Sequence, residues 1–189
     1  MNTTTRIGRV PFDALPERMQ TSWQRSQQRR SDAVFVEALG NAPELFDWYT
    51  EFYARIFYGG RVGVRYKEML RYRLSSAHGC RHCNLGNRLD AIDAGLTDSD
   101  LDRIAAGDYT TFTDAERCLL TLAERIALTS PDGYVDATLH RELAVHFSDG
   151  EILELGITAA VLTGMAKFLF AFDLVEREAT CPIGRGSEA

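Results

Sequence analysis

Two cysteines separated by two residues, Cys80 and Cys83, have the types and spacing in this sequence that most directly suggest chemistry. Residues three apart share one face of a helix, so the two thiols can close a disulfide with little backbone movement. Gly79 interrupts the preceding helical pattern and places both cysteines in a first helical turn, where free N–H groups and the helix dipole stabilise a thiolate. Nearby basic side chains, such as Arg81 and Arg88, favour the thiolate further. The pattern predicts a reactive dithiol.

Glu68 is the acidic residue that could act with this dithiol. It lies twelve residues before Cys80 and fifteen before Cys83. On one straight helix those separations would be about 18 and 22 Å. Contact therefore requires the chain to fold back near residues 77–79, where a His-Gly pair can break a helix, or requires a second subunit.

A glutamate followed, after eleven residues, by Cys-x-x-Cys resembles the core motif of the carboxymuconolactone decarboxylase-like superfamily, in particular its alkylhydroperoxidase D-like branch. The resemblance covers about residues 32–175 and includes the flanking segments LGNAPELFDWYTEFY, FTDAERCLLTLAERIA and HFSDGEILELGITAAVLTGMAKFLFAFDL. It implies an all-α fold, a single-domain multi-helix bundle that assembles as a homo-oligomer. Residues 1–31 would then be an N-terminal helical extension, and residues 176–189 a C-terminal tail.

The resemblance also implies a role for each matching residue. Cys83 corresponds to the peroxidatic thiol, Cys80 to the resolving thiol, and Glu68 to the base of a proton relay. The implied activity is a thiol-dependent peroxidase, which reduces a hydroperoxide substrate and needs no cofactor or metal. Its reductant would be a dithiol protein of the lipoyl or thioredoxin-like kind.

One position departs from the family pattern. Four residues after the second cysteine the family usually has a histidine, and here Asn87 stands there. Asparagine can orient a water molecule or a peroxide oxygen, but it cannot shuttle a proton. His82, between the two cysteines, is the better substitute for the relay, and His78 is the other candidate. If neither substitutes, turnover is slow or the chemistry has shifted.

Other interpretations of the same residues stay open. The cysteines could be half of a zinc site, although no second pair completes four ligands, or they could be small core residues. Two further functions compete with the peroxidase. One is lactone decarboxylation, or a related small-molecule reaction, on the same scaffold. The other is a non-enzymatic redox sensor in which the disulfide changes the oligomeric state.

Composition and charge argue against a nucleic-acid-binding, a membrane and a secreted protein. The chain has 189 residues, 45% of them hydrophobic, and a net charge of −6. This balance argues against a nucleic-acid face, and the two basic stretches, 25–30 and 65–73, are interpreted as solvated helix faces. No membrane partner is expected, because no apolar run approaches the roughly 18 residues that a membrane span requires. The beginning of the chain lacks a secretory pattern, and the four cysteines suggest reduced thiols in the cytoplasm.

Helical periodicity and capping residues predict the elements that position these groups. Three Ser/Thr-x-x-Asp/Glu capping boxes begin at Thr97, Thr113 and Ser148. The helix after Ser148 is apolar nearly all round and must be buried, in a core or between subunits. The segment from Thr180 is expected to be frayed. The predicted helical spans are 12–28, a short one ending at 40, 43–58, 65–77, 80–94, one following 97, 113–128, 136–147 and 149–172.

Overall fold

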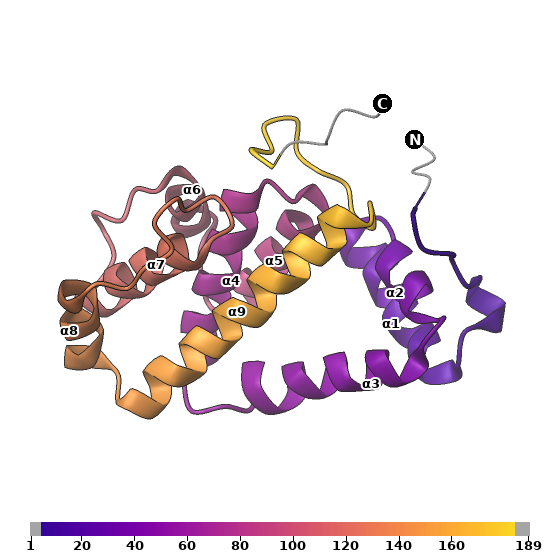
Figure 1. The fold of residues 1–189 in the computed structure, drawn as a ribbon, viewed down its shortest axis with the longest axis horizontal. Coiled ribbons are helices and arrows are strands. Elements are labelled where there is room, and N and C mark those ends of the chain that lie inside the picture. Colours follow the sequence, from indigo (N-terminus) through magenta and orange to yellow (C-terminus); the bar gives the residue numbers. More distant parts are fainter. Residues whose placement is uncertain (1–4, 184–189) are drawn as a thin grey trace.

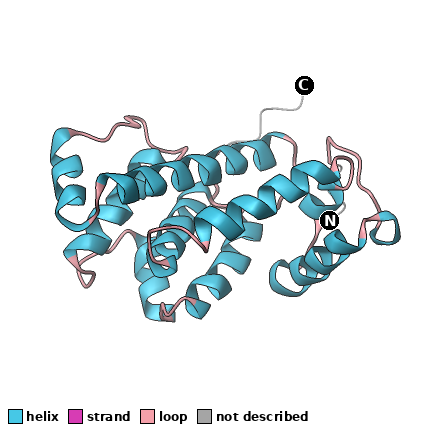
Figure 2. Ribbon diagram, turned by 90° about the horizontal axis from the view of Figure 1, so that it is seen from below, coloured by secondary structure: helices cyan, strands magenta, loops and turns pink. Residues whose placement is uncertain are grey.

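The computed structural model describes residues 5–183, and within them the regular elements are all helical, as predicted (Figures 1 and 2). A 3-10 turn at Phe12–Ala14 precedes the first helix, and a π-helical turn at Tyr53–Phe57 follows the third. The α-helices are α1 (Glu17–Arg30), α2 (Val34–Leu39), α3 (Pro43–Phe52), α4 (Val64–His78), α5 (Arg81–Asp93), α6 (Asp98–Ala106), α7 (Asp114–Ile126), α8 (Ala137–His146) and α9 (Asp149–Ala171).

Local sequence explains several of the boundaries. All three capping boxes form. In each, the carboxylate of the residue three positions after the Ser or Thr accepts hydrogen bonds from the hydroxyl and the backbone N–H of that Ser or Thr. Gly79 ends α4 with φ of +64°, a conformation that a residue with a Cβ rarely adopts. The predicted helix from Phe12 is wrong in its first turn, because Pro16 interrupts it and α1 begins at Glu17.

The central helix is α4, which packs against α5, α6, α7 and α9. Figure 1 shows α9 crossing over α4 and α5, with α3 along one side and α1 and α2 at one end. Met69, Leu70 and Leu74 are almost fully buried in the middle of α4. A helix surrounded on so many sides must also bury its polar side chains, which then need partners within the protein.

The interpretation of residues 65–73 as a solvated basic face is therefore wrong at two positions. The Lys67 side chain is completely buried, and its Nζ lies 2.6 Å from Glu154 Oε1 on α9. Arg71 is 5% exposed and is paired with carboxylates on α4 and α5. Both charges point into the bundle because α4 has neighbours on every side, which charge patterning along the chain does not reveal.

The helix α9 is long and apolar enough to cross a membrane by length and composition, which corrects the expectation that no such segment exists. It nevertheless packs against α4, α7 and α8, as the core helix of a globular domain does. Only part of its apolar surface is covered: Leu155 and Ala159 are buried, whereas Leu153 and Ile157 are 64% and 49% exposed.

The last described segment, residues 174–183, crosses the junction between α4 and α5. The Glu178 N–H donates to the Gly79 carbonyl at 2.8 Å, and the Cys181 thiol donates to the His78 carbonyl at 3.0 Å. The expectation of a frayed end is thus wrong for residues 180–183, while residues 184–189 lie outside the described part of the chain. The segment covers the break that separates α4 from the cysteine pair.

Candidate active site

The dithiol stands at the beginning of α5, where the sequence predicted it. Cys80 and Cys83 are joined by a disulfide, with their Cα atoms 5.2 Å apart. Cys80 is the N-cap of α5, and the Cys83 backbone N–H donates to the Cys80 sulfur at 3.2 Å. Cys80 is 1% exposed, whereas Cys83 is half-buried. Cys83 is therefore the more exposed residue of the two, and both line the same cavity.

The chain folds back at Gly79, so that α4 and α5 pack side by side. This brings Glu68 close to α5 through an arginine. The buried Glu68 carboxylate accepts three hydrogen bonds from Arg71, at 2.6 to 2.9 Å, and Arg71 also donates to Asp90 on α5 at 2.9 Å. Burial raises the pKa of Glu68, and the adjacent Arg71 guanidinium opposes that effect only in part.

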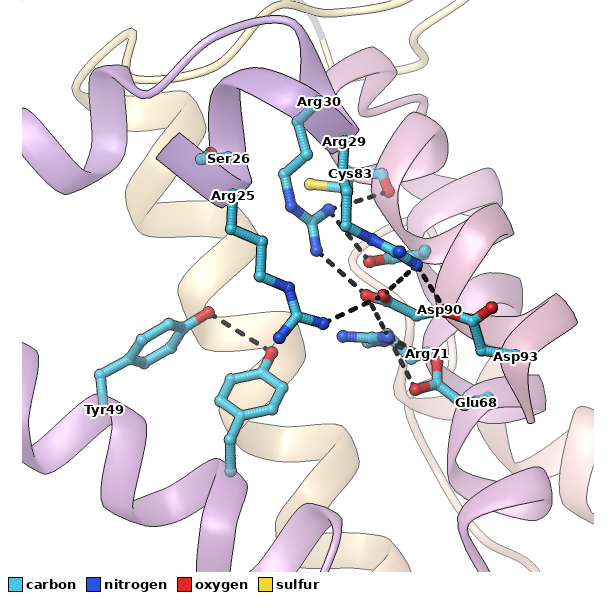
Figure 3. Close-up of polar contacts among 12 residues, drawn as sticks. Arg25, Ser26, Arg29, Arg30, Tyr49, Glu68, Arg71, Cys83, Asp90 and Asp93 are labelled. Carbon is cyan, nitrogen blue, oxygen red and sulfur yellow. Dashed lines mark hydrogen bonds and ion pairs between the residues drawn. The ribbon is translucent and has the colours of Figure 1, made fainter. Parts of the chain in front are cut away.

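Asp90 is the centre of a cluster of arginines (Figure 3). Besides Arg71, it accepts from Arg29 at 2.8 Å and from Arg30 at 3.3 Å, both on α1. Arg25 lies 3.7 Å from the same carboxylate. The interpretation of residues 25–30 as a solvated face is wrong for Arg29 and Arg30, because α1 packs against α5 and directs these side chains inward.

A cavity of about 310 Å³ joins the cysteine pair to this arginine cluster. Arg30 and Arg71 form part of its polar wall, and Leu162, Met165 and Leu169 of α9 form part of its apolar wall. The phenol oxygens of Tyr49 and Tyr53, 3.4 Å apart, belong to the same lining (Figure 3). A small organic molecule can thus lie within reach of the sulfurs.

The two histidines near the dithiol are held differently. His82 lines the cavity, and its Nδ1 lies 2.9 Å from Asp32 Oδ2. His78 accepts a hydrogen bond from the Leu128 backbone N–H at Nε2, and burial lowers the pKa of His78 to about 4. His78 is therefore neutral at physiological pH, with that nitrogen already occupied. This geometry favours His82 over His78 as a proton carrier.

Within residues 5–183, no group of three or more His, Cys, Asp or Glu side chains is arranged to hold a metal ion. The predicted zinc alternative therefore has no ligand set in the described part of the chain. Cys118, buried on α7, and Cys181, in the C-terminal segment, are both free thiols.

Residues 43–125 match the family model of the carboxymuconolactone decarboxylase family. The match includes Glu68, both cysteines of the disulfide and Asp90. Over this segment, which is somewhat less than half of its length, the chain is similar to the carboxymuconolactone decarboxylase family. A comparison with curated proteins found no match.

Solved structures share the fold of this chain over nearly its whole length. An uncharacterized peroxidase-related protein from Ralstonia eutropha JMP134, described as an alkylhydroperoxidase AhpD core, is 15% identical, with a TM-score of 0.73 and 95% of each chain covered. A peroxidase-related protein from Silicibacter sp. TM1040 is 14% identical, with a TM-score of 0.73 and 96% and 95% coverage. A cysteine-to-alanine variant of the debrominase Bmp8, in complex with 2,3,4-tribromopyrrole, is 20% identical, with a TM-score of 0.71 and 95% and 94% coverage.

Asn87, where the superfamily pattern usually has histidine, belongs to the arginine cluster. It is 5% exposed, and its Oδ1 accepts from Arg30 Nη1 at 3.4 Å. A neutral acceptor is well suited to this position, because a protonated imidazole would face the Arg30 guanidinium at the same distance.

Sequence reasoning missed Arg30, Arg71, Asp90 and Asp32 as parts of the site. A periodic signal existed for some of them. On α5, Cys83, Asn87 and Asp90 repeat at spacings of four and three, which places them on one helix face. On α4, Glu68 and Arg71 begin a similar row that continues to Ser75 and His78. No such signal existed for Arg30 and Asp32, because their approach depends on how α1 and the following loop dock against α5.

Proposed function

We propose that this protein is a thiol-dependent peroxidase that reduces organic hydroperoxides through the Cys80–Cys83 pair. The observation that carries the proposal is the disulfide at the N-terminus of α5, on the wall of an organic-sized cavity. The superfamily and its peroxidase-related structural relatives support the same class of enzyme.

The cycle starts with the reduced pair. The Cys83 thiolate attacks the distal oxygen of the hydroperoxide, the O–O bond breaks, and an alkoxide leaves and takes a proton to become the alcohol. Cys83 is then a sulfenic acid. The Cys80 thiol condenses with it, forming the disulfide and releasing water. A dithiol protein, of lipoyl or thioredoxin-like type, reduces the disulfide and is itself oxidised, which balances the two electrons given to the peroxide.

The exposure of the two sulfurs supports these roles. Cys83 is half-buried on the cavity wall, whereas Cys80 is 1% exposed. A hydroperoxide entering the cavity therefore meets Cys83 first. The N-cap position of Cys80 keeps its sulfur against the Cys83 N–H, within the same helical turn as the sulfenic acid that it must attack.

Two groups supply proton transfer in this proposal. His82 donates from Nδ1 to Asp32, which leaves Nε2 as the basic nitrogen. Glu68, whose pKa burial raises, is connected to the cavity through Arg71 and accepts a proton through water. Asn87 keeps Arg30 in position rather than carrying a proton.

Stopped-flow kinetics with tert-butyl hydroperoxide and pre-reduced protein test the proposal. We expect fast consumption by the wild type, a dimedone adduct on Cys83 in Cys80→Ser, and loss of consumption in Cys83→Ser. The free Cys118 gives a matched control, since Cys118→Ser removes a buried thiol outside the cavity. A wild-type rate no faster than that of free cysteine would overturn the peroxidase assignment.

Reductive dehalogenation by the same dithiol is a second candidate, because the debrominase Bmp8 shares the fold and was captured with a halogenated pyrrole. In this reaction, two thiols give two electrons, hydrogen replaces bromine on the ring, bromide leaves, and the disulfide forms. Bromide release from 2,3,4-tribromopyrrole by the reduced protein, with no peroxide consumption, would favour this activity. If neither occurs, lactone decarboxylation and disulfide-dependent assembly are the alternatives to test.

A further inference from the structure

The arginines around the cavity are not equally paired. Arg71 is bound by Glu68 and Asp90, and Arg29 by Asp90 and Asp93, each at 2.9 Å or less. Arg30 has only long contacts, at 3.3 to 3.5 Å, to Asp90, to Asn87 and to the Cys83 carbonyl. Arg25 lies farther still from Asp90, at 3.7 Å, but its side chain is 68% exposed and solvated. Because a typical N–H···O distance is about 2.9 Å, Arg30 has the weakest partners among the three arginines that are largely buried.

The balance of charge at the cluster is positive. Among the described residues, four guanidiniums, those of Arg25, Arg29, Arg30 and Arg71, face the carboxylates of Asp90, Glu68 and Asp93. One positive charge is therefore left without a carboxylate. Burial and the neighbouring Arg71 guanidinium lower the pKa of Arg30, and the Asp90 carboxylate opposes that effect only in part.

The helix α5 provides space for Arg30. Gly86, one turn after Cys83, has no side chain, and a Cβ built at that position would collide with the Arg30 guanidinium. Arg30 thus lies flat against the backbone of α5, close to the turn that carries the reactive sulfur. Figure 3 shows its side chain extending from α1 toward Asp90 and the Cys83 carbonyl.

Part of the cavity wall is apolar. Phe35 and the α9 residues Leu162, Met165 and Leu169 line the same cavity as the arginines. A ligand that fits both walls has an apolar body and one negative charge. Arginine binds a carboxylate with two parallel hydrogen bonds, which a neutral hydroperoxide cannot accept.

We propose that the substrates are organic hydroperoxides that carry a carboxylate, and that Arg30 binds this carboxylate while the peroxide group reaches Cys83. This inference rests on the proposed peroxidase function. Arg30 then determines specificity and takes no part in the breaking of the O–O bond. A neutral hydroperoxide still reacts, but it lacks the ion pair.

The test compares 4-carboxycumene hydroperoxide with its methyl ester, which has nearly the same shape but no charge. In the wild type, we expect the carboxylate to react about tenfold faster than the ester. Arg30→Gln should reduce this ratio to about one. Gly86→Ala, which displaces the guanidinium but keeps its charge, should reduce the ratio in the same direction.

Arg18→Gln is the matched control, since Arg18 lies on the same helix and pairs with Asp47 outside the cavity. It should keep the wild-type ratio. Equal ratios in Arg30→Gln, Arg18→Gln and the wild type would overturn the carboxylate assignment and leave the peroxidase function intact.

A binding measurement separates the two proposals. If the wild type consumes no hydroperoxide, the proposed function fails, and calorimetry with 4-isopropylbenzoate tests the anion site by itself. Binding of this carboxylate that weakens about tenfold in Arg30→Gln would support the site. Equal affinity in both proteins, or no binding to the wild type, would overturn it.

Discussion

His82 Nδ1 and Asp32 Oδ2 lie 2.9 Å apart, which connects the imidazole next to Cys83 with a carboxylate from the loop between α1 and α2. A carboxylate at Nδ1 fixes both the tautomer and the orientation of the ring, so that Nε2 stays available as a base. The reactive turn of α5 thereby depends on a residue fifty positions earlier in the chain.

The histidine–aspartate contact predicts a graded loss of activity. His82→Asn should lower the rate of Cys83 sulfenic acid formation by about a hundredfold, the usual effect of losing a positioned base. Asp32→Asn should lower it by about tenfold, because the imidazole remains but loses its orienting partner. Single-turnover kinetics with tert-butyl hydroperoxide measure both. The control is His146→Asn, at the exposed end of α8, and an unchanged rate in His82→Asn would contradict the role.

The buried Glu68–Arg71 pair predicts a loss of stability when its carboxylate is removed. Glu68→Gln removes the charge that Arg71 contacts most closely, and Asp90 compensates only in part, so we expect a loss of about 2 to 3 kcal/mol in unfolding free energy. Urea unfolding measures it. Glu124→Gln, which breaks the more exposed pair with Arg73, should cost less than about 1 kcal/mol. Similar losses in both variants would contradict the contrast between buried and exposed pairs.

The buried His78 predicts an acid-dependent loss of stability. Its pKa is about 4 in the folded protein and near 6.5 when unfolded, so above pH 6.5 both states are neutral at this residue. As the pH falls from 6.5 toward 4, the unfolded state binds the proton first, and stability decreases. At pH 5 the loss relative to pH 8 is about 2 kcal/mol from this group alone.

Urea unfolding of the wild type and of His78→Gln at both pH values isolates that contribution. Glutamine retains an acceptor for the Leu128 N–H but has no proton to gain in this range. The variant should lose about 2 kcal/mol less than the wild type between pH 8 and pH 5. Equal losses in the two proteins would show that His78 does not titrate as its burial implies.

The uncovered apolar face of α9 predicts a homo-oligomer. Leu153 and Ile157, one turn apart, are both largely exposed on a helix whose composition is otherwise that of a core. Light scattering after size exclusion should give a multiple of 21.2 kDa for the wild type, and Leu153→Glu with Ile157→Glu should give the monomer. Val145→Glu, at an apolar position on α8 that is even more exposed, is the control. If Val145→Glu dissociated the oligomer and the double variant of α9 did not, the interface would not lie on this face of α9.

Much of the fold follows from local sequence. The capping boxes, the break at Gly79 and the nearly all-apolar α9 determine where helices begin, end and pack, and each was predicted. The dithiol was predicted for the same reason, since its two residues are close in the sequence. The burial of the charged side chains was not predicted, because Lys67 and Arg71 have the sequence context of surface residues. Lys67 and Arg71 are buried because other helices surround α4. Arg30 is buried because α1 docks against α5. Both causes lie in the tertiary structure, which the local sequence does not reveal.

The unequal burial of the two sulfurs has a consequence for the return half of the cycle. An incoming thiolate can reach Cys83 from the cavity side, whereas Cys80 is enclosed below the segment that carries Cys181. In the proposed cycle, the reductant would therefore form its mixed disulfide with Cys83, and Cys80 would depart as a thiolate at the cap of α5, where the Cys83 N–H already faces its sulfur. Under this proposal, regeneration proceeds in one direction, with Cys83 as the attacked sulfur and Cys80 as the leaving sulfur.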